Sequence, residues 1–78
     1  MTNLEKYNQA FITTFNVSPE KLNGLKYQDI PEWDSVGHMT LVAELEDAFD
    51  ISLETDDIID FSDYDKGKEI LKKYDVEI

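Results

Sequence analysis

The sequence predicts a small all-α protein, a bundle of three main helices and one short helix with a long loop after the first helix. Three observations lead to this fold class. Apolar residues recur at helical spacing in three segments, capping residues precede those segments, and no alternating apolar and polar run is long enough for a sheet strand. The 78 residues, 41% of them hydrophobic, suffice for one packed domain that spans residues 1–78.

The first helix is predicted over residues 3–15. Thr2 followed three positions later by Glu5 is a capping box, in which each residue satisfies a free backbone donor of the other. Apolar residues then recur at helical spacing, at Leu4, Tyr7, Phe11 and Phe15. These residues predict one face packed against the core.

Residues 16–33 are predicted to be a long connection. Ser18 and Pro19 favour a single helical turn, whereas Gly24 and Pro31 interrupt regular structure in the rest. The connection also contains four apolar residues, which predict that it packs onto the core: Leu22, Leu25, Tyr27 and Ile30.

The second helix is the clearest element. Asp34 or Ser35 can act as its N-cap, and Asp50 with the β-branched Ile51 marks its end. Its apolar stripe has steps of three, three and four residues, at Met39, Val42, Leu45 and Phe49.

Two further helices are predicted in the last third of the chain. Thr55 begins a short turn that runs through Ile59, and Ser62 with Asp65 forms a second capping signature that opens the last helix. The last helix is predicted to run through Ile70, Leu71 and Tyr74. Four lysines favour its C-terminal half, where the helix dipole is negative: Lys66, Lys68, Lys72 and Lys73.

The charge is strongly acidic, with 18 acids, seven lysines and a formal net charge of −11. Thirteen carboxylates and no Lys or Arg lie between Lys26 and Lys66. Such a field repels nucleic acid and anionic lipid and attracts basic protein surfaces. The chain has no apolar run of membrane-spanning length and no signal-peptide pattern. We therefore expect a cytoplasmic protein that does not associate with membranes. The absence of cysteine excludes disulfides and a protein thiol nucleophile.

One segment carries the strongest functional signal, Glu-Trp-Asp-Ser-Val-Gly-His-Met at residues 32–39. An Asp-Ser pair followed by an aliphatic residue, at the start of an acidic amphipathic helix, resembles the attachment motif of acyl carrier proteins. Residues 41–51 are similar to the second helix of that family. A short acidic element at residues 56–61 and a last helix rich in lysine follow in the family's order. The resemblance therefore covers nearly the whole chain.

The resemblance implies that Ser35 receives a 4'-phosphopantetheine arm, with Asp34 and Val36 beside the attachment point. The thiol of that arm would hold acyl or aminoacyl groups as thioesters, and the protein would shuttle them between biosynthetic enzymes without being an enzyme itself. Gly37 and Thr40 replace acidic or polar residues of the fatty-acid-synthesis pattern. The segment is therefore more similar to the specialised bacterial carriers that accompany dedicated acyl or aminoacyl ligases.

The resemblance also implies partners and a pocket. The expected partners are a phosphopantetheinyl transferase and acyl-loading or acyl-using enzymes with basic surfaces. The protein itself is expected to be a monomer. The residues expected to contact these enzymes are Asp34, Val36, Glu46 and Asp47. The residues expected to line an acyl-chain pocket are Met39, Val42, Leu45, Leu53, Ile58 and Ile59.

The same residues have plainer interpretations. Ser35, taken alone, is an ordinary helix cap, the apolar set is core, and Trp33 is a packing residue. His38 has no second His or Cys near it in sequence, so no metal site is expected, and the acids from Asp56 to Asp65 lack the glycine and glutamate positions of an EF-hand. The alternative function is an unmodified acidic domain that binds a basic partner through residues 40–65.

Overall fold

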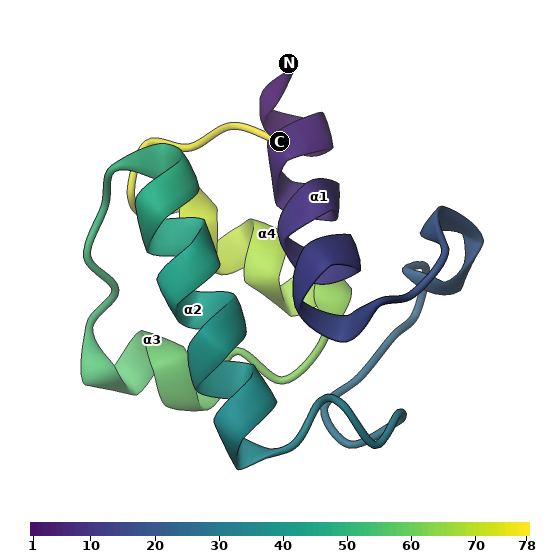
Figure 1. The fold of residues 1–78 in the computed structure, drawn as a ribbon. Helices are drawn as coiled ribbons and strands as arrows, with labels where there is room; N and C mark the ends of the chain where they lie inside the picture. Colours follow the sequence, from purple (N-terminus) through teal and green to yellow (C-terminus); the bar gives the residue numbers. More distant parts are fainter.

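The computed structural model describes all residues, 1–78, and contains four α-helices and one 3-10 turn (Figure 1). The elements in chain order are α1 (Asn3–Phe15), η1 (Pro19–Lys21), α2 (Ser35–Phe49), α3 (Thr55–Asp60) and α4 (Tyr64–Lys72). The only β pairing is an isolated antiparallel bridge between Lys26 and Asp63. The protein is therefore all-α, as the sequence predicts. No helix combines the length and the apolar character that crossing a bilayer requires.

The predicted capping box begins α1. The Glu5 N–H donates to Thr2 Oγ1 at 3.1 Å, and the Thr2 N–H donates to Glu5 Oε1 at 2.8 Å. The helix ends where Asn16 takes a left-handed conformation with φ 54°. Both boundaries agree with the predicted span of residues 3–15.

The long connection packs onto the bundle, as predicted. Leu22 and Leu25 are buried, and Tyr27 and Ile30 lie partly buried against the core. Backbone hydrogen bonds fasten the connection to the start of α4, because the Tyr27 N–H donates to the Ser62 carbonyl at 2.9 Å. This contact places Tyr27 close to Ser35 at the start of α2.

An aromatic cluster fills the centre of the bundle. Phe11 is its hub, with ring centroids between 5.0 and 6.2 Å from those of Tyr7, Phe15, Trp33, Phe61 and Tyr64. α4 approaches this cluster closely, since a Cβ at Gly67 would overlap the Tyr7 hydroxyl and the Phe61 ring.

Tyr7 also forms a buried hydrogen bond within this cluster. Its hydroxyl donates to the Tyr64 carbonyl at 2.5 Å. Burial raises the pKa of the Tyr7 phenol well above its ordinary range, so Tyr7 remains a neutral donor.

The last helix differs from its predicted boundaries. Asp63, not Ser62, is the N-cap, and its Oδ1 accepts from the Lys66 N–H at 2.6 Å. The Ser62 carbonyl accepts from the Tyr27 N–H, so Ser62 lies in the segment before the helix. At the other end α4 stops at Lys72, so Tyr74 lies beyond the helix. The two termini lie side by side in Figure 1, and the Asn3 side chain donates to the Glu77 carbonyl at 3.0 Å.

Candidate functional site

Ser35 is the first residue of α2, and its side chain is exposed. Asp34 is the N-cap: its Oδ1 accepts from the Gly37 N–H at 2.8 Å. The first helical hydrogen bond runs from the His38 N–H to the Asp34 carbonyl at 2.7 Å. The N–H groups of Ser35 and Val36 precede that bond and have no helical acceptor. The Ser35 hydroxyl therefore lies at the positive end of the 15-residue helix.

A close contact of the backbone explains why residue 37 is glycine. A Cβ at this position would overlap the Glu32 carbonyl oxygen and lie 3.2 Å from the Phe15 ring. Glycine in a helix costs about 1 kcal/mol relative to alanine. Here it permits the turn before α2 to pack directly against the first turn of the helix, which holds Ser35 at the surface.

Tyr27 is a site residue that the sequence analysis assigned only to packing. Its hydroxyl lies 3.1 Å from Ser35 Oγ, within hydrogen-bonding distance. Its ring packs edge-on to His38, with a centroid separation of 5.4 Å. No local pattern links residues 27 and 35, because the path of the intervening turn alone determines their distance.

A half-open cavity of about 360 Å³ begins at Ser35 and extends between α2 and α3. Its lining is mostly apolar and consists of Tyr27, Ser35, His38, Met39, Ile58, Ile59, Phe61 and Ser62. Three residues predicted for an acyl pocket are among them, namely Met39, Ile58 and Ile59.

The other three predicted pocket residues do not line the cavity. Val42, Leu45 and Leu53 are 2%, 0% and 8% exposed and belong to the hydrophobic core. Their spacing on an apolar stripe predicts burial, but a stripe does not distinguish a cavity wall from a filled core. Of the six residues predicted to line an acyl pocket, three therefore line the cavity and three lie in the hydrophobic core.

His38 connects the start of α2 to α3. The Trp33 indole N–H donates to His38 Nδ1 at 2.9 Å, and His38 Nε2 lies 2.8 Å from the Ile58 carbonyl. Because an indole nitrogen can only donate, Nδ1 is the acceptor and the Nε2–H donates to Ile58. The Ile58 carbonyl lies in the last turn of the six-residue α3, where carbonyls lack helical donors.

Packing in the core holds Trp33, the hydrogen-bond donor to His38, in place. It is fully buried and stacks on Phe15 at a centroid distance of 5.2 Å, which confirms its predicted packing role. His38 likewise serves packing. No group of three or more His, Cys, Asp or Glu side chains is arranged to hold a metal ion.

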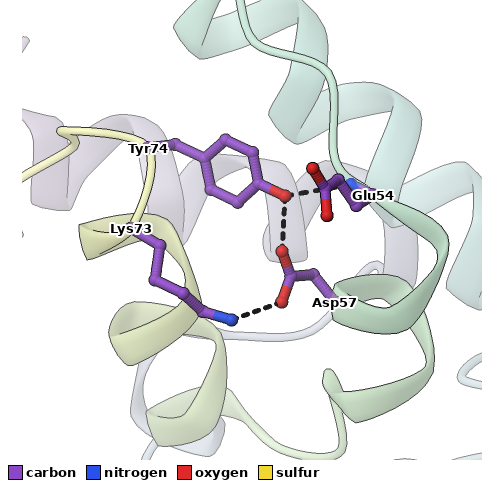
Figure 2. A network of polar contacts seen from close by, with 4 residues as sticks. All are labelled: Glu54, Asp57, Lys73 and Tyr74. Carbon is purple, nitrogen blue, oxygen red and sulfur yellow. Dashed lines mark hydrogen bonds and ion pairs between the residues drawn. The ribbon is translucent and has the colours of Figure 1, made fainter.

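A second network holds α3 against the end of the chain (Figure 2). Asp57 accepts from Lys73 Nζ at 2.6 Å and from the Tyr74 hydroxyl at 2.5 Å, while the Glu54 N–H donates to the Tyr74 oxygen at 2.9 Å. Hydrogen bonds from Lys73 and Tyr74 lower the pKa of Asp57 below its ordinary range. This cluster cannot be predicted from the sequence, because Asp57 and Lys73 are 16 positions apart and no motif marks them.

The predicted partner-contact residues fall into two groups. Asp34 and Val36 flank Ser35, and Val36 is 76% exposed. Asp47 is exposed near the far end of α2. Glu46 is half-buried, and its Oε2 accepts from the Leu53 N–H at 2.8 Å, so it also holds the loop between α2 and α3.

The acidic surface is almost uncompensated. The only salt bridge is that between Lys73 and Asp57, although the chain carries 18 acids. Most of the carboxylates between Lys26 and Lys66 are exposed, and apart from Asp57 none of them forms an ion pair.

No family model, no curated protein and no solved structure matches this chain. The function is therefore inferred from the chain's own residues and from the geometry around Ser35.

Proposed function

We propose that the protein is an acyl carrier protein in which Ser35 receives a 4'-phosphopantetheine arm from coenzyme A. The observation that carries the proposal is an exposed serine hydroxyl at the N-terminus of the longest helix, directly beside a half-open apolar cavity. The order of a long helix, a long connection, a second long helix, a short acidic helix and a last helix supports the finer description as a carrier-type bundle.

The residues around Ser35 fit the group. A phosphodiester on Ser35 would lie at the positive end of α2, next to the free N–H groups of Ser35 and Val36, a favourable place for an anion. The Tyr27 hydroxyl supplies a further donor at 3.1 Å from Ser35 Oγ. The Asp34 carboxylate is nearby but is already an acceptor for the Gly37 N–H, which turns it toward the helix.

The arm, when attached, supplies the thiol that this cysteine-free chain lacks, and that thiol forms the thioester. The protein's own residues present and shelter the attachment point and perform no chemistry on the cargo. Asp34, Val36 and Asp47 are the exposed residues available to transferases and acyl-handling enzymes with basic surfaces. In this proposal the protein acts as a cytoplasmic monomer.

Intact mass spectrometry tests the proposal directly. After incubation with coenzyme A and a broad-specificity phosphopantetheinyl transferase, we expect the mass to increase by one phosphopantetheinyl group. Ser35→Ala should remain at its original mass while keeping its helicity, because Asp34 and not Ser35 is the N-cap. A mass gain by the alanine variant, or none by the wild type, would reject the assignment.

The uncompensated acidic surface favours one second candidate, an unmodified domain that binds a basic partner. This candidate predicts no change of mass and salt-sensitive binding that Ser35→Ala leaves intact. The same experiment therefore separates the two functions.

A further inference from the structure

We infer, on the basis of the proposed function, that Trp33 masks the one imidazole beside the arm, so that His38 does not catalyse hydrolysis of the thioester. His38 is the only histidine of the chain and lines the same cavity as Ser35. It follows Ser35 by three positions on α2, which is close to one helical turn. A group tethered to Ser35 therefore comes within reach of this imidazole.

An unmasked imidazole beside a thioester would shorten the lifetime of the cargo. A neutral imidazole has one nitrogen with a free lone pair, which acts as a general base near neutral pH. That nitrogen would take a proton from a water molecule as the water oxygen adds to the thioester carbonyl. The C–S bond then breaks, the same proton passes to the departing sulfur, and the acyl group leaves as a carboxylate whose own proton is lost to solvent.

The structure leaves His38 without a free lone pair. The Trp33 indole N–H donates to Nδ1 at 2.9 Å, and Nε2 carries the proton that is donated to the Ile58 carbonyl at 2.8 Å. Protonation at Nδ1 would leave the indole N–H of the fully buried Trp33 without an acceptor, and a buried donor without a partner is costly. Stacking on Phe15 at a centroid distance of 5.2 Å holds the donor in place. Trp33 is therefore a positioning residue that acts through His38.

The other groups near Ser35 fit the same requirement. The chain has no cysteine, and it has no Lys or Arg between Lys26 and Lys66, the segment that contains every residue of the cavity lining. The lining contributes hydroxyl groups but no carboxylate and no amine. His38 is thus the one side chain of the lining whose type acts as a base near neutral pH.

Diethyl pyrocarbonate tests the masking on the unmodified protein, independently of any arm. This reagent acylates an imidazole nitrogen that has a free lone pair, and peptide mapping locates the product. Trp33→Phe keeps an aromatic ring but removes the N–H donor, and circular dichroism verifies that the variant folds. His38 in this variant should react about two- to tenfold faster than in the wild type, the equivalent of one hydrogen bond. Equal rates in a folded variant would overturn the inference.

The lifetime of an acetyl thioester tests the consequence. Wild type and variants would be loaded from acetyl-coenzyme A by a transferase, and intact mass would follow the loss of acetyl. Trp33→Phe should lose acetyl about three- to tenfold faster, which is less than the roughly 10²-fold effect of a fully positioned general base. The added rate should rise with pH between about pH 5 and 8, the range in which imidazoles lose their proton.

A double variant separates loss of masking from loosening of the fold. Trp33→Phe with His38→Gln should return to the wild-type lifetime, because glutamine keeps a donor for the Ile58 carbonyl but has no basic nitrogen. A double variant that loses acetyl as fast as Trp33→Phe would show that the imidazole is not responsible, and the inference would be wrong.

Met39→His keeps the inference testable if Trp33→Phe does not fold. It places an imidazole without a tryptophan donor in the cavity lining and should also shorten the lifetime of the thioester. The control Ala48→His adds the same side chain at an exposed position 13 residues after Ser35, about 20 Å along α2, and should not. A wild-type lifetime for Met39→His would overturn the inference while the proposed function stands. A wild type that gains no mass from coenzyme A would reject the proposed function and the inference with it.

Discussion

At the scale of single residues, Gly37 is a position where contacts with other parts of the chain outweigh the local helix propensity. Helical propensity disfavours glycine in the first turn of α2. The Glu32 carbonyl and the Phe15 ring leave no space for a Cβ at that position. The same close packing supports the turn that presents Ser35.

Gly37→Ala should therefore destabilise the protein, by about 1–3 kcal/mol as expected for overpacking, instead of stabilising it by about 1 kcal/mol as helix propensity predicts. Urea unfolding of the purified variant measures the difference. Thr40→Ala, at an exposed position on the same helix, is the control and should change stability little. A more stable Gly37→Ala variant would show that the turn before α2 moves freely.

Tyr27 is the other residue whose role depends on a tertiary contact. If its hydroxyl orients Ser35 Oγ, Tyr27→Phe should slow phosphopantetheinyl transfer about two- to tenfold, the equivalent of one hydrogen bond of about 0.5–1.5 kcal/mol. Initial rates from time-resolved intact mass provide the measurement. Ser62→Ala removes another hydroxyl from the cavity lining and should leave the rate unchanged. Equal rates for Tyr27→Phe and the wild type would leave Tyr27 with a packing role only.

At the scale of elements, α3 is a six-residue helix that holds its position through its neighbours. A helix this short is marginal on its own. The N–H of its N-cap Glu54 donates to Tyr74, Asp57 accepts from Lys73, and the Ile58 carbonyl accepts from His38. Glu46 holds the loop that leads into it. The position of the cavity wall thus depends on residues from two other segments, α2 and the chain that follows α4.

Asp57→Asn should lower the melting temperature at neutral pH, because the ion pair with Lys73 is lost. Since the folded state lowers the pKa of Asp57, its contribution is present above the ordinary value of 3.8 and disappears as the pH falls through the lowered value. The melting temperatures of variant and wild type should therefore converge in strong acid. A gap that stays constant across the acid range would mean that the Asp57 charge does not contribute.

At the scale of the whole molecule, the distribution of charge opposes the compact state. The net charge is −11, and only one of the 18 acids forms an ion pair within the fold. Mutual repulsion of exposed carboxylates is larger in the folded chain than in the expanded one. The aromatic core has to outweigh this repulsion.

Added salt should therefore raise the melting temperature, because ions screen repulsion beyond about 10 Å at 0.1 M. Moderate acidification should act in the same direction until Asp57 itself titrates. Calorimetry from low to moderate salt, with sodium chloride as the only variable, provides the measurement. A melting temperature that falls steadily over this range would contradict the interpretation.

The sequence by itself determined the helices, because apolar periodicity is a local property of the chain. The capping box of Thr2 with Glu5 needed only its neighbours to be recognised, whereas the sequence left both Asp34 and Ser35 open as the N-cap of α2. Tertiary structure alone decided that Asp63 caps α4, that Tyr27 meets Ser35 and that Asp57 pairs with Lys73. It also separated cavity from core within a single apolar stripe. Periodicity is a property of neighbouring residues, whereas burial within a stripe and the distances between segments follow from how the whole bundle packs: Met39 is 53% exposed and Val42 2%.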